Sequence, residues 1–266
     1  LREQVTATDH AIGKIQRARS QFPQAIEAYT AALQATADPA RRAVLKVDLG
    51  EAYVGAADER ALPLLREALE ELDPAAQGHD AARATLWLGR YYHLRAHYAQ
   101  AIGYLERARQ LLEPLGDPAT LRFVYHYMAA ALLFAGRFAE SERWTRRCIE
   151  LGQAAQSLPA VAVGYWYLAK NAFYQGRWGD TYAEAGRGQA SVQAYERQSG
   201  VRYMDWAAIP PVSAAYCQGE LATGVRLARA CVQQAAEVGD RRAALWTNRV
   251  LVMLEVAALS SRPMVM

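Results

Sequence analysis

A short turn that recurs after 40 residues is the feature that most limits how this chain can fold. Ala-Gly-Arg-Phe occupies residues 135–138, and Gln-Gly-Arg-Trp occupies residues 175–178. In both places the turn precedes a bulky aromatic residue that can open a helix. A repeat period between about 20 and 50 residues is typical of proteins built from stacked units, in which each unit buries its apolar face against the next. The chain is therefore predicted to be a repeat protein.

The same turn can be followed beyond these two copies. A step of 40 residues back from Phe138 leads to Tyr98, and a step of 43 residues forward from Trp178 leads to Leu221. Each of these residues also follows a short turn. A small or polar residue comes three positions later, in the series Ala25, Ala61, Ala101, Ser141, Thr181 and Gly224, with spacings of 36, 40, 40, 40 and 43 residues. The near-constant spacing predicts six units.

Helices rather than strands are expected within each unit. Apolar residues recur at intervals of three and four, for example at Ala101, Leu105, Ala108 and Leu112, which is the pattern of one helix face. No segment alternates between apolar and polar residues for long enough to indicate a strand. Because a unit of this length holds two helices of about 14 to 17 residues, we predict an all-α fold of about six antiparallel helical hairpins plus a terminal helix.

The predicted hairpins form a single repeat domain that covers residues 1–266. Asp-Pro, Gly-Asp and similar helix breakers separate them. The hairpins span about residues 6–37, 41–73, 80–114, 119–155, 160–196 and 203–237, and the terminal helix spans about residues 240–260. The sequence begins at Leu1 rather than at Met and ends after an apolar helical stretch, so we expect it to be a fragment of a longer chain.

Two adjacent prolines interrupt the first helix of the sixth hairpin. Pro210 and Pro211 each lack a backbone N–H, and a proline ring clashes with the turn that precedes it. We therefore predict that this helix kinks or starts late. Carbonyl groups freed near Trp206 could help to hold a ligand, while the alternative is a kink that the longer 43-residue repeat absorbs.

Large and small residues alternate across both helices of the early hairpins. In the third hairpin these positions are Leu88, Gly89, Tyr92, Tyr98, Ala101, Leu105 and Ala108, and the second matches at Leu49, Gly50, Tyr53, Ala61, Leu65 and Ala68. The pattern resembles the tetratricopeptide-repeat family. Ala129 and Ala169 stand where that family has glycine, which indicates its looser relatives. The resemblance implies a right-handed superhelical solenoid, similar to the C-terminal repeat regions of bacterial signalling ATPases and ATP-dependent transcription regulators.

The resemblance also implies which side chains can meet a partner, because in that family the first helix of each hairpin lines the concave face. Arg83, Phe134 and Trp206 are among the residues on this predicted face. Aromatic rings bury area and cations pair with carboxylates, so an acidic or C-terminal peptide suits the face. The alternative for each aromatic residue is a place in the core between helices. The predicted contacts are Arg90, His93, His126, Trp166, Lys170 and Tyr174.

We expect the chain to be a protein- or peptide-binding scaffold, acting as the docking or sensor region of a larger bacterial regulator in the cytoplasm. The alternative is a small-molecule effector-binding domain of a transcription regulator or signalling ATPase, in which the same groove closes around a metabolite. A homodimer through the terminal helix is the other interaction that the sequence allows, because Leu251, Val252, Leu254 and Val256 need cover.

Other classes of function have little support in the sequence. Thirty basic and 27 acidic side chains give a net charge of +3, which is too small to favour nucleic acid. No apolar stretch approaches the roughly 20 residues of a membrane helix, and three scattered cysteines give no disulfide framework. His93, His97 and His126 could come near one another, but no further ligand completes a metal site. We therefore predict no catalysis, no metal and no cofactor.

Overall fold

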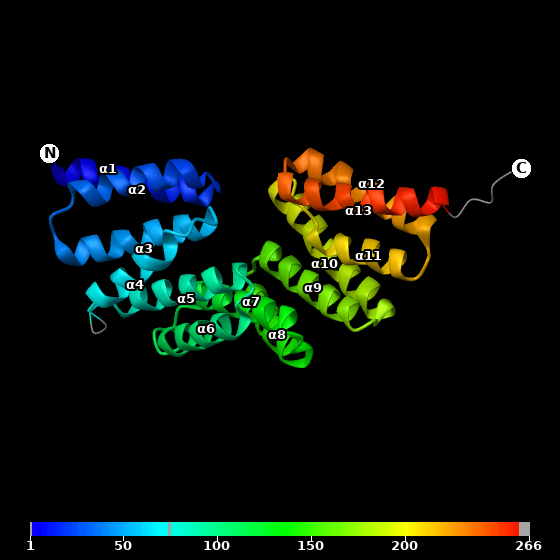
Figure 1. Cartoon of the computed structure of the whole chain (residues 1–266), viewed down its shortest axis with the longest axis horizontal. Coiled ribbons are helices and arrows are strands. Elements are labelled where there is room, and N and C mark those ends of the chain that lie inside the picture. The colour runs from blue at the N-terminus through cyan, green and yellow to red at the C-terminus, as the bar shows by residue number, and fades with distance from the viewer. Residues whose placement is uncertain (1, 74–75, 261–266) are drawn as a thin grey trace, which may run out of the picture. The chain divides into compact units, whose positions relative to one another are not determined.

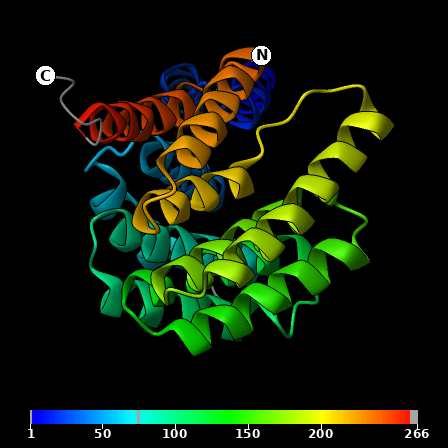
Figure 2. The same ribbon diagram turned by 90° about the vertical axis from the view of Figure 1, so that its right-hand side faces the viewer.

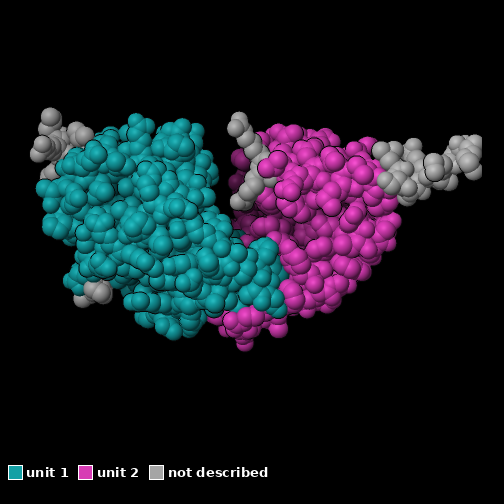
Figure 3. Space-filling view, in the orientation of Figure 1, with its two compact units in different colours: residues 1–136 teal, residues 137–266 magenta. Residues whose placement is uncertain are grey.

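The computed structural model describes residues 2–73 and 76–260 of the chain. These residues form thirteen α-helices and one turn of 3-10 helix, and none of them lies in a β-strand (Figure 1). The all-α helical-repeat fold that the sequence predicts is therefore confirmed. Contacts within the chain divide it into two compact units, unit 1 (Leu1–Gly136) and unit 2 (Arg137–Met266), which Figure 3 shows in different colours.

Seven helices make up unit 1. They are α1 (Arg2–Ala18), α2 (Phe22–Ala35), α3 (Pro39–Gly55), α4 (Ala61–Glu71), α5 (Gly78–Leu94), α6 (Tyr98–Leu112) and α7 (Pro118–Phe134). Each helix packs against the next along the chain, and α5 also contacts α3 and α7. The first helices of successive hairpins therefore lie against one another, as in stacked helical hairpins.

Six helices and the 3-10 turn make up unit 2. They are α8 (Phe138–Ala154), α9 (Leu158–Tyr174), α10 (Trp178–Ser199), the 3-10 turn η1 (Trp206–Ala208), α11 (Ile209–Cys217), α12 (Leu221–Val238) and α13 (Arg241–Ser260). Successive helices again pack on one another, and α11 contacts α9 as well as α12. Figure 2 shows the extended connection that leaves the end of α10 and leads to η1.

A left-handed residue closes the turn inside every hairpin. It comes two residues after the end of the first helix, at Ser20, Ala57, Ala96, Gly136, Gly176 and Gly219, with φ between +57° and +75°. The bulky residues Tyr98, Phe138, Trp178 and Leu221 are the first residues of α6, α8, α10 and α12, as the repeat predicts. A β-carbon disfavours this backbone conformation by about 1–2 kcal/mol, so the early turns, which use serine or alanine, are strained relative to the later glycine turns.

Glycines of the first helices allow close packing of the second helices. A β-carbon added at Gly50 would lie 2.5 Å from a methyl group of Leu65, and one added at Gly89 would lie 2.7 Å from Leu105. Both leucines are fully buried. The alternation of small and large residues seen in the sequence is therefore a physical fit between the two helices of a hairpin.

The two prolines delay the start of a helix, which is one of the two outcomes that the sequence predicts. Pro210 and Pro211 lie in the first turn of α11, where a missing backbone N–H leaves no helical hydrogen bond unmade. Before them, Asp205 caps η1 by accepting a hydrogen bond from the backbone N–H of Ala207 at 3.1 Å. As a result, α11 has 9 residues, whereas α9 has 17.

Among the described residues, none of the helices combines the length and the hydropathy that crossing a lipid bilayer requires. The predicted terminal helix corresponds to α13. The extent of a single repeat domain over residues 1–266 stays a prediction.

Candidate functional site

Arg90, on helix α5 of unit 1, is held by aromatic rings. Its guanidinium donates a hydrogen bond of 2.5 Å to the hydroxyl of Tyr127 on α7. The guanidinium carbon lies 5.2 Å from the ring centre of Trp87 and 4.9 Å from that of Tyr127, which are distances of cation–π contact. No carboxylate of the described residues forms an ion pair with Arg90. The arrangement orients the cation without neutralising its charge.

The two histidines predicted as contacts also lie among rings of unit 1. The centre of the His93 ring is 5.9 Å from that of Tyr98 and 5.8 Å from that of Phe134. His126 meets Tyr127 edge-on at 4.8 Å. His126 and Arg90 therefore share Tyr127 as a neighbour, whereas His93 belongs to a separate ring cluster at the end of α5.

The other three predicted contacts lie four residues apart on α9 of unit 2, which places them on one face of the helix. The Nζ atom of Lys170 is 5.0 Å from the ring centre of Trp166, and Trp166 lies 5.5 Å from Trp206 of η1. Tyr174 is 49% exposed at the end of the helix and meets Phe173 edge-on at 5.4 Å. The structure thus brings Trp166, Lys170 and Trp206 together within unit 2.

Burial changes the electrostatics of this group. It lowers the pKa of Lys170 to about 8, because a desolvated ammonium is less stable than one in water. The amine is still mostly protonated at pH 7. The indole Nε1 of Trp166 is also buried, and it makes no hydrogen bond within the described residues. A cation and a buried N–H donor on one helix face together favour an anionic acceptor.

A second charged group, in unit 1, was not predicted. Asp48 and Glu51 of α3 are 1% and 5% exposed. Arg83 of α5 donates to Asp48 at 2.5 Å and to Glu51 at 3.0 Å. From α1, the Nε2 atom of His10 lies 2.6 Å from Asp48, and Arg17 pairs with Glu51. These five residues, the buried ion cluster, connect three successive first helices.

The two carboxylates of the buried ion cluster differ in pKa. Burial alone would raise the pKa of Asp48, but the hydrogen bond with His10 and the charge of Arg83 outweigh it and bring the pKa to about 2. Burial raises the pKa of Glu51, and the charges of Arg17 and Arg83 offset only part of that effect. Asp48 is therefore the more firmly ionised partner of Arg83.

The side-chain partners of Arg90, Arg83 and Asp48 each lie about one repeat away in the sequence. Tyr127 is 37 residues from Arg90, Arg83 is 35 residues from Asp48, and Asp48 is 38 residues from His10. Each separation is close to one repeat. Pairs of complementary residues one repeat apart would have pointed to Tyr127, Asp48 and His10 as neighbours on the first helices of successive hairpins.

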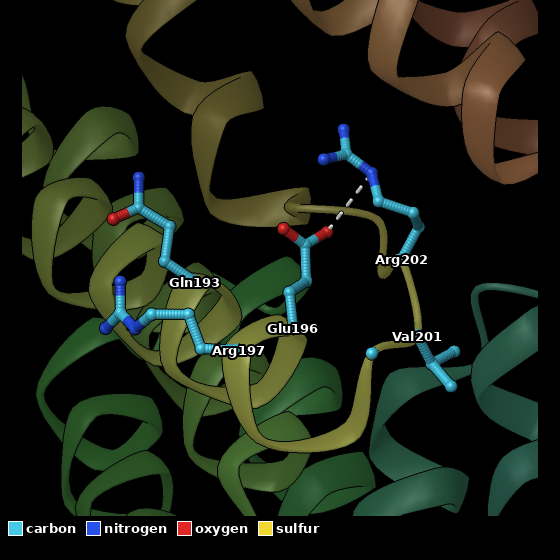
Figure 4. Close-up of a pocket in the computed structure, with 6 residues that line it drawn as sticks. Gln193, Glu196, Arg197, Val201 and Arg202 are labelled. Atoms are coloured by element: carbon cyan, nitrogen blue, oxygen red, sulfur yellow. Dashed lines mark ion pairs between the residues drawn. The ribbon is translucent and has the colours of Figure 1, made fainter.

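A pocket of unit 2 lies outside the predicted face. It is formed where α10 ends and the extended connection begins (Figure 4). Its residue Arg202 pairs with Glu196 at 3.7 Å and with Glu237 at 2.6 Å. None of the six predicted contacts lines it. The lining residues are Gln193, Glu196, Arg197, Gly200, Val201 and Arg202.

In the part of the chain that the structure describes, the side chains form neither a metal site nor a reactive thiol site. No group of three or more His, Cys, Asp and Glu side chains there could hold a metal ion. Cys148 and Cys231 are buried, and Cys217 is exposed. Burial raises the pKa of Cys231 to about 12, so this thiol stays protonated at neutral pH.

No protein-family model matches the sequence, and no curated protein matches it. Solved structures do match the fold. A STAND signal transduction ATPase with a tetratricopeptide repeat sensor, from Pyrococcus horikoshii, superposes with a TM-score of 0.70 at 14% identity, over 97% of this chain and 39% of that one. A Rap protein in complex with competence and sporulation factor superposes with a TM-score of 0.66 at 13% identity, over 97% of this chain and 77% of that one.

These likenesses define the class of structure. The chain has a tetratricopeptide-like helical-repeat fold, as the sequence predicts. It spans less than two fifths of the STAND chain but more than three quarters of the Rap chain. A shared fold does not by itself define a function, which depends on the residues of the site.

Proposed function

We propose that the chain is a cytoplasmic docking or sensor region of a larger bacterial regulatory protein, and that it binds an acidic segment of a protein or peptide. The contacts in this proposal are Arg90, His93 and His126 of unit 1 and Trp166, Lys170 and Tyr174 of unit 2. The fold supports the binding class, since one similar structure is a Rap protein complexed with a factor and another carries a repeat sensor.

The observation that carries the acidic character is the pair of donors on α9. Lys170 lies over the ring of Trp166, and the indole N–H of Trp166 is buried without an acceptor. A carboxylate of the partner would pair with Lys170 and would relieve the cost of a desolvated cation. In unit 1, Arg90 offers a second cation that rings orient.

The test uses synthetic peptides in matched pairs, in which an acidic sequence is compared with its Glu→Gln and Asp→Asn counterpart. The wild-type chain is expected to retain a subset of the acidic peptides and none of their neutral counterparts. Lys170→Met removes the charge but keeps most of the volume, and it should weaken that binding by about tenfold or more. Fluorescence anisotropy measures the dissociation constants.

A matched control is available in the same unit. Arg226 on α12 is exposed, so Arg226→Gln also removes one positive charge but leaves α9 intact. It should bind the acidic peptides as the wild type does. Equal binding of acidic and neutral peptides, or equal losses in both variants, would show that Lys170 does not select a carboxylate.

The effector-binding alternative gives a different result in the same samples. Native mass spectrometry of the purified chain would then show a bound metabolite that Trp166→Ala releases, and no peptide would be retained. Self-association through the terminal helix involves none of the six contact residues, so it can be measured separately.

A further inference from the structure

The turn η1, which carries Trp206 to the candidate site on α9, fits closely against α10. A β-carbon added at Gly188 of α10 would lie 2.5 Å from the β-carbon of Ala207, and Ala207 is 1% exposed. The same turn also contacts α9, where the ring of Trp206 lies 5.5 Å from that of Trp166. We call this arrangement of η1 the docked position. The two indole rings meet only when η1 is docked.

Side chains of α10 and α12 hold the extended connection that leads to η1. Glu196 accepts a hydrogen bond of 3.0 Å from the backbone N–H of Tyr203. Gln234 donates to the carbonyl oxygen of Tyr203 and accepts from the backbone N–H of Asp205, both at 3.4 Å. The carboxylate of Asp205 in turn accepts from the backbone N–H of Ala207 at 3.1 Å. Asp205 therefore links the connection to η1.

The charge of Asp205 is not explained by this capping bond. Asp205 is 3% exposed, and no cation of the described residues lies close enough to stabilise its ionised form. A carboxylate that is buried without a cation is costly. An asparagine would cap a helical turn about as well as an aspartate, without that cost. The acid at residue 205 therefore has a consequence beyond the cap.

The titratable groups around Asp205 favour its neutral form. Burial raises the pKa of Asp205 to about 6, and the charge of Glu196 on α10 adds to this effect, while backbone N–H groups of η1 offset part of it. Arg202 is the only basic residue of the connection, and it pairs with Glu196 at 3.7 Å and with Glu237 at 2.6 Å. From α12, the thiol of Cys231 stays neutral, because burial and the charge of Asp205 raise its pKa to about 12.

The described neighbours of η1 from α11 and α13 are apolar. Ile209 and Ala243 form a cluster with Met204, and Trp206 packs against it. Leu254 of α13 is fully buried in the adjoining cluster, so it does not need the cover that the sequence predicts for it. These two helices therefore offer Asp205 no charge to compensate its own.

We propose that Asp205 is a positioning residue that couples the binding of an acidic partner on α9 to the uptake of a proton. When the carboxyl group is neutral, it suits its apolar surroundings and η1 stays docked on Trp166. When the group is ionised, its buried charge favours an open position of η1 in water and opposes an anion at Lys170. The effect on binding rests on the proposed function, whereas the docking of Trp206 requires no partner.

The direction of the effect follows from the solvation of the carboxyl group. In the open position Asp205 meets water and has an ordinary pKa of about 4, whereas in the docked position its pKa is about 6. The docked position therefore holds the proton more tightly, and docking weakens as pH rises from about 4 to 6. Between pH 5 and pH 7 the equilibrium constant for opening should rise by about tenfold.

Hydrogen exchange of the whole chain, followed by mass spectrometry, tests the docking without a partner. After correction for the intrinsic effect of pH on exchange, the backbone N–H groups of residues 206–208 should be about tenfold less protected at pH 7 than at pH 5. Asp205→Asn should give equal protection at both pH values. Asp180→Asn, which removes a 57% exposed carboxylate of α10, is the matched control and should behave as the wild type does.

Two results of the exchange experiment would overturn the positioning role. One is equal protection of residues 206–208 at pH 5 and pH 7 in the wild type. The other is a loss of protection at pH 7 that persists in Asp205→Asn, because the titrating group would then lie elsewhere.

Gly188→Ala tests the close fit of η1 without changing a charge. The added methyl group would meet Ala207, so η1 should open and residues 206–208 should lose protection by about tenfold or more at both pH values. Alanine is a better helix former than glycine, so α10 itself should remain intact by circular dichroism. Unchanged protection of η1 in this variant would show that the fit against α10 does not hold it.

Peptide binding tests the coupling to the proton. An acidic synthetic peptide that the wild type retains should bind about threefold more tightly at pH 5 than at pH 7. Isothermal titration calorimetry at pH 6, in two buffers that differ in their enthalpy of ionisation, should show net uptake of protons on binding. Asp205→Asn should remove both the pH dependence and its share of the proton uptake, whereas Asp180→Asn should keep them.

The outcomes separate this inference from the proposed function. If acidic peptides bind equally well at both pH values, or if Asp205→Asn takes up as many protons as the wild type, the coupling is wrong and the proposed function stands. If no acidic peptide is retained at either pH, the proposed function and the coupling both fail. The exchange experiment then still decides whether Asp205 positions Trp206.

Discussion

The first helices of the hairpins use charge in opposite ways in the two units. In unit 1 the buried carboxylates of Asp48 and Glu51 pair with Arg83. In unit 2 Lys170 lies over the ring of Trp166, and burial lowers its pKa to about 8. Glu51 and Lys170 occupy the same place in the repeat, six residues before the left-handed turn residue. One position of the fold thus holds neighbouring helices together in unit 1 and presents a cation in unit 2.

The largest expected effect comes from removing the cation of the buried ion cluster. Arg83→Ala leaves Asp48 and Glu51 buried with fewer partners, so it should lower the free energy of unfolding by about 3 kcal/mol or more. Urea denaturation measures the loss, and hydrogen exchange should locate it in α3 and α5. Arg226→Ala at an exposed site should change the free energy by less than about 0.5 kcal/mol. Similar shifts in both variants would show that the cluster does not hold the helices together.

Asp205 of unit 2 and Asp48 of unit 1 should change the free energy of unfolding in opposite directions as pH falls. Asp48, with a folded pKa of about 2, stabilises the fold above its unfolded pKa of about 4, and this contribution is lost as pH falls toward 2. Burial raises the pKa of Asp205 to about 6, despite hydrogen bonds from the backbone N–H groups of Ala207 and Ala208. The folded state then holds a proton that the unfolded state has released, so stability falls as pH rises from about 4 to 6.

Asp205→Asn isolates this effect, because the amide oxygen can still accept from the backbone N–H of Ala207. The variant should unfold at a higher urea concentration than the wild type at pH 7, by about 2 kcal/mol. At pH 4 the two should be nearly equal. A constant difference at both pH values would mean that Asp205 does not titrate in this range.

Lys170→Met gives a smaller effect, opposite in sign to that of Arg83→Ala. It removes a desolvated cation, so it should raise the free energy of unfolding at pH 7 by about 1–2 kcal/mol. The lowered pKa means that the destabilisation by Lys170 is complete below pH 8 and disappears as pH rises through the unfolded value of about 10.5. Wild type and variant should therefore converge in urea midpoint near that pH. A variant that is less stable than the wild type would show that Lys170 helps to hold helices together, as Arg83 does.

The smallest effects should come from exchanging turn residues between the units. Ala96→Gly relieves a left-handed alanine in unit 1 and should stabilise the chain by about 0.5–1 kcal/mol. Gly176→Ala imposes the same strain on unit 2 and should destabilise it by about 1 kcal/mol. Thermal unfolding of both variants measures these shifts. If both substitutions changed the stability in the same direction, the φ values of the two turns would not determine their preference for glycine.

Much of the fold could be predicted because the features that define the repeat depend on residues that are close together in the sequence. The turn before Tyr98, Phe138, Trp178 and Leu221 depends on neighbours in sequence, and helical spacing follows from apolar residues three and four apart. The late start of the helix at Ile209 follows from proline chemistry alone. These features depend little on what packs against them.

The side-chain partners could not be predicted in the same way. The resemblance places Arg90 on the predicted concave face, but its contact with Tyr127 depends on how far α5 and α7 are shifted along each other. The burial of Asp48 depends on cations from two other helices arriving at once. Sequence patterns within one helix carry no information on that shift, and only the spacing of complementary residues about one repeat apart points to the buried ion cluster.

The two prolines of α11 have a consequence for side-chain contacts as well as for the backbone. If the helix continued without interruption before residue 209, Trp206 would lie within it and its side chain would take the direction that helical geometry sets. In this structure the extended segment and the turn η1 instead place the indole of Trp206 against Trp166. Pro210 and Pro211 thus determine both where α11 begins and how Trp206 contacts Trp166. Under the proposed function, Pro210 and Pro211 would contribute to partner binding without touching the partner, because they set the path that brings Trp206 against Trp166.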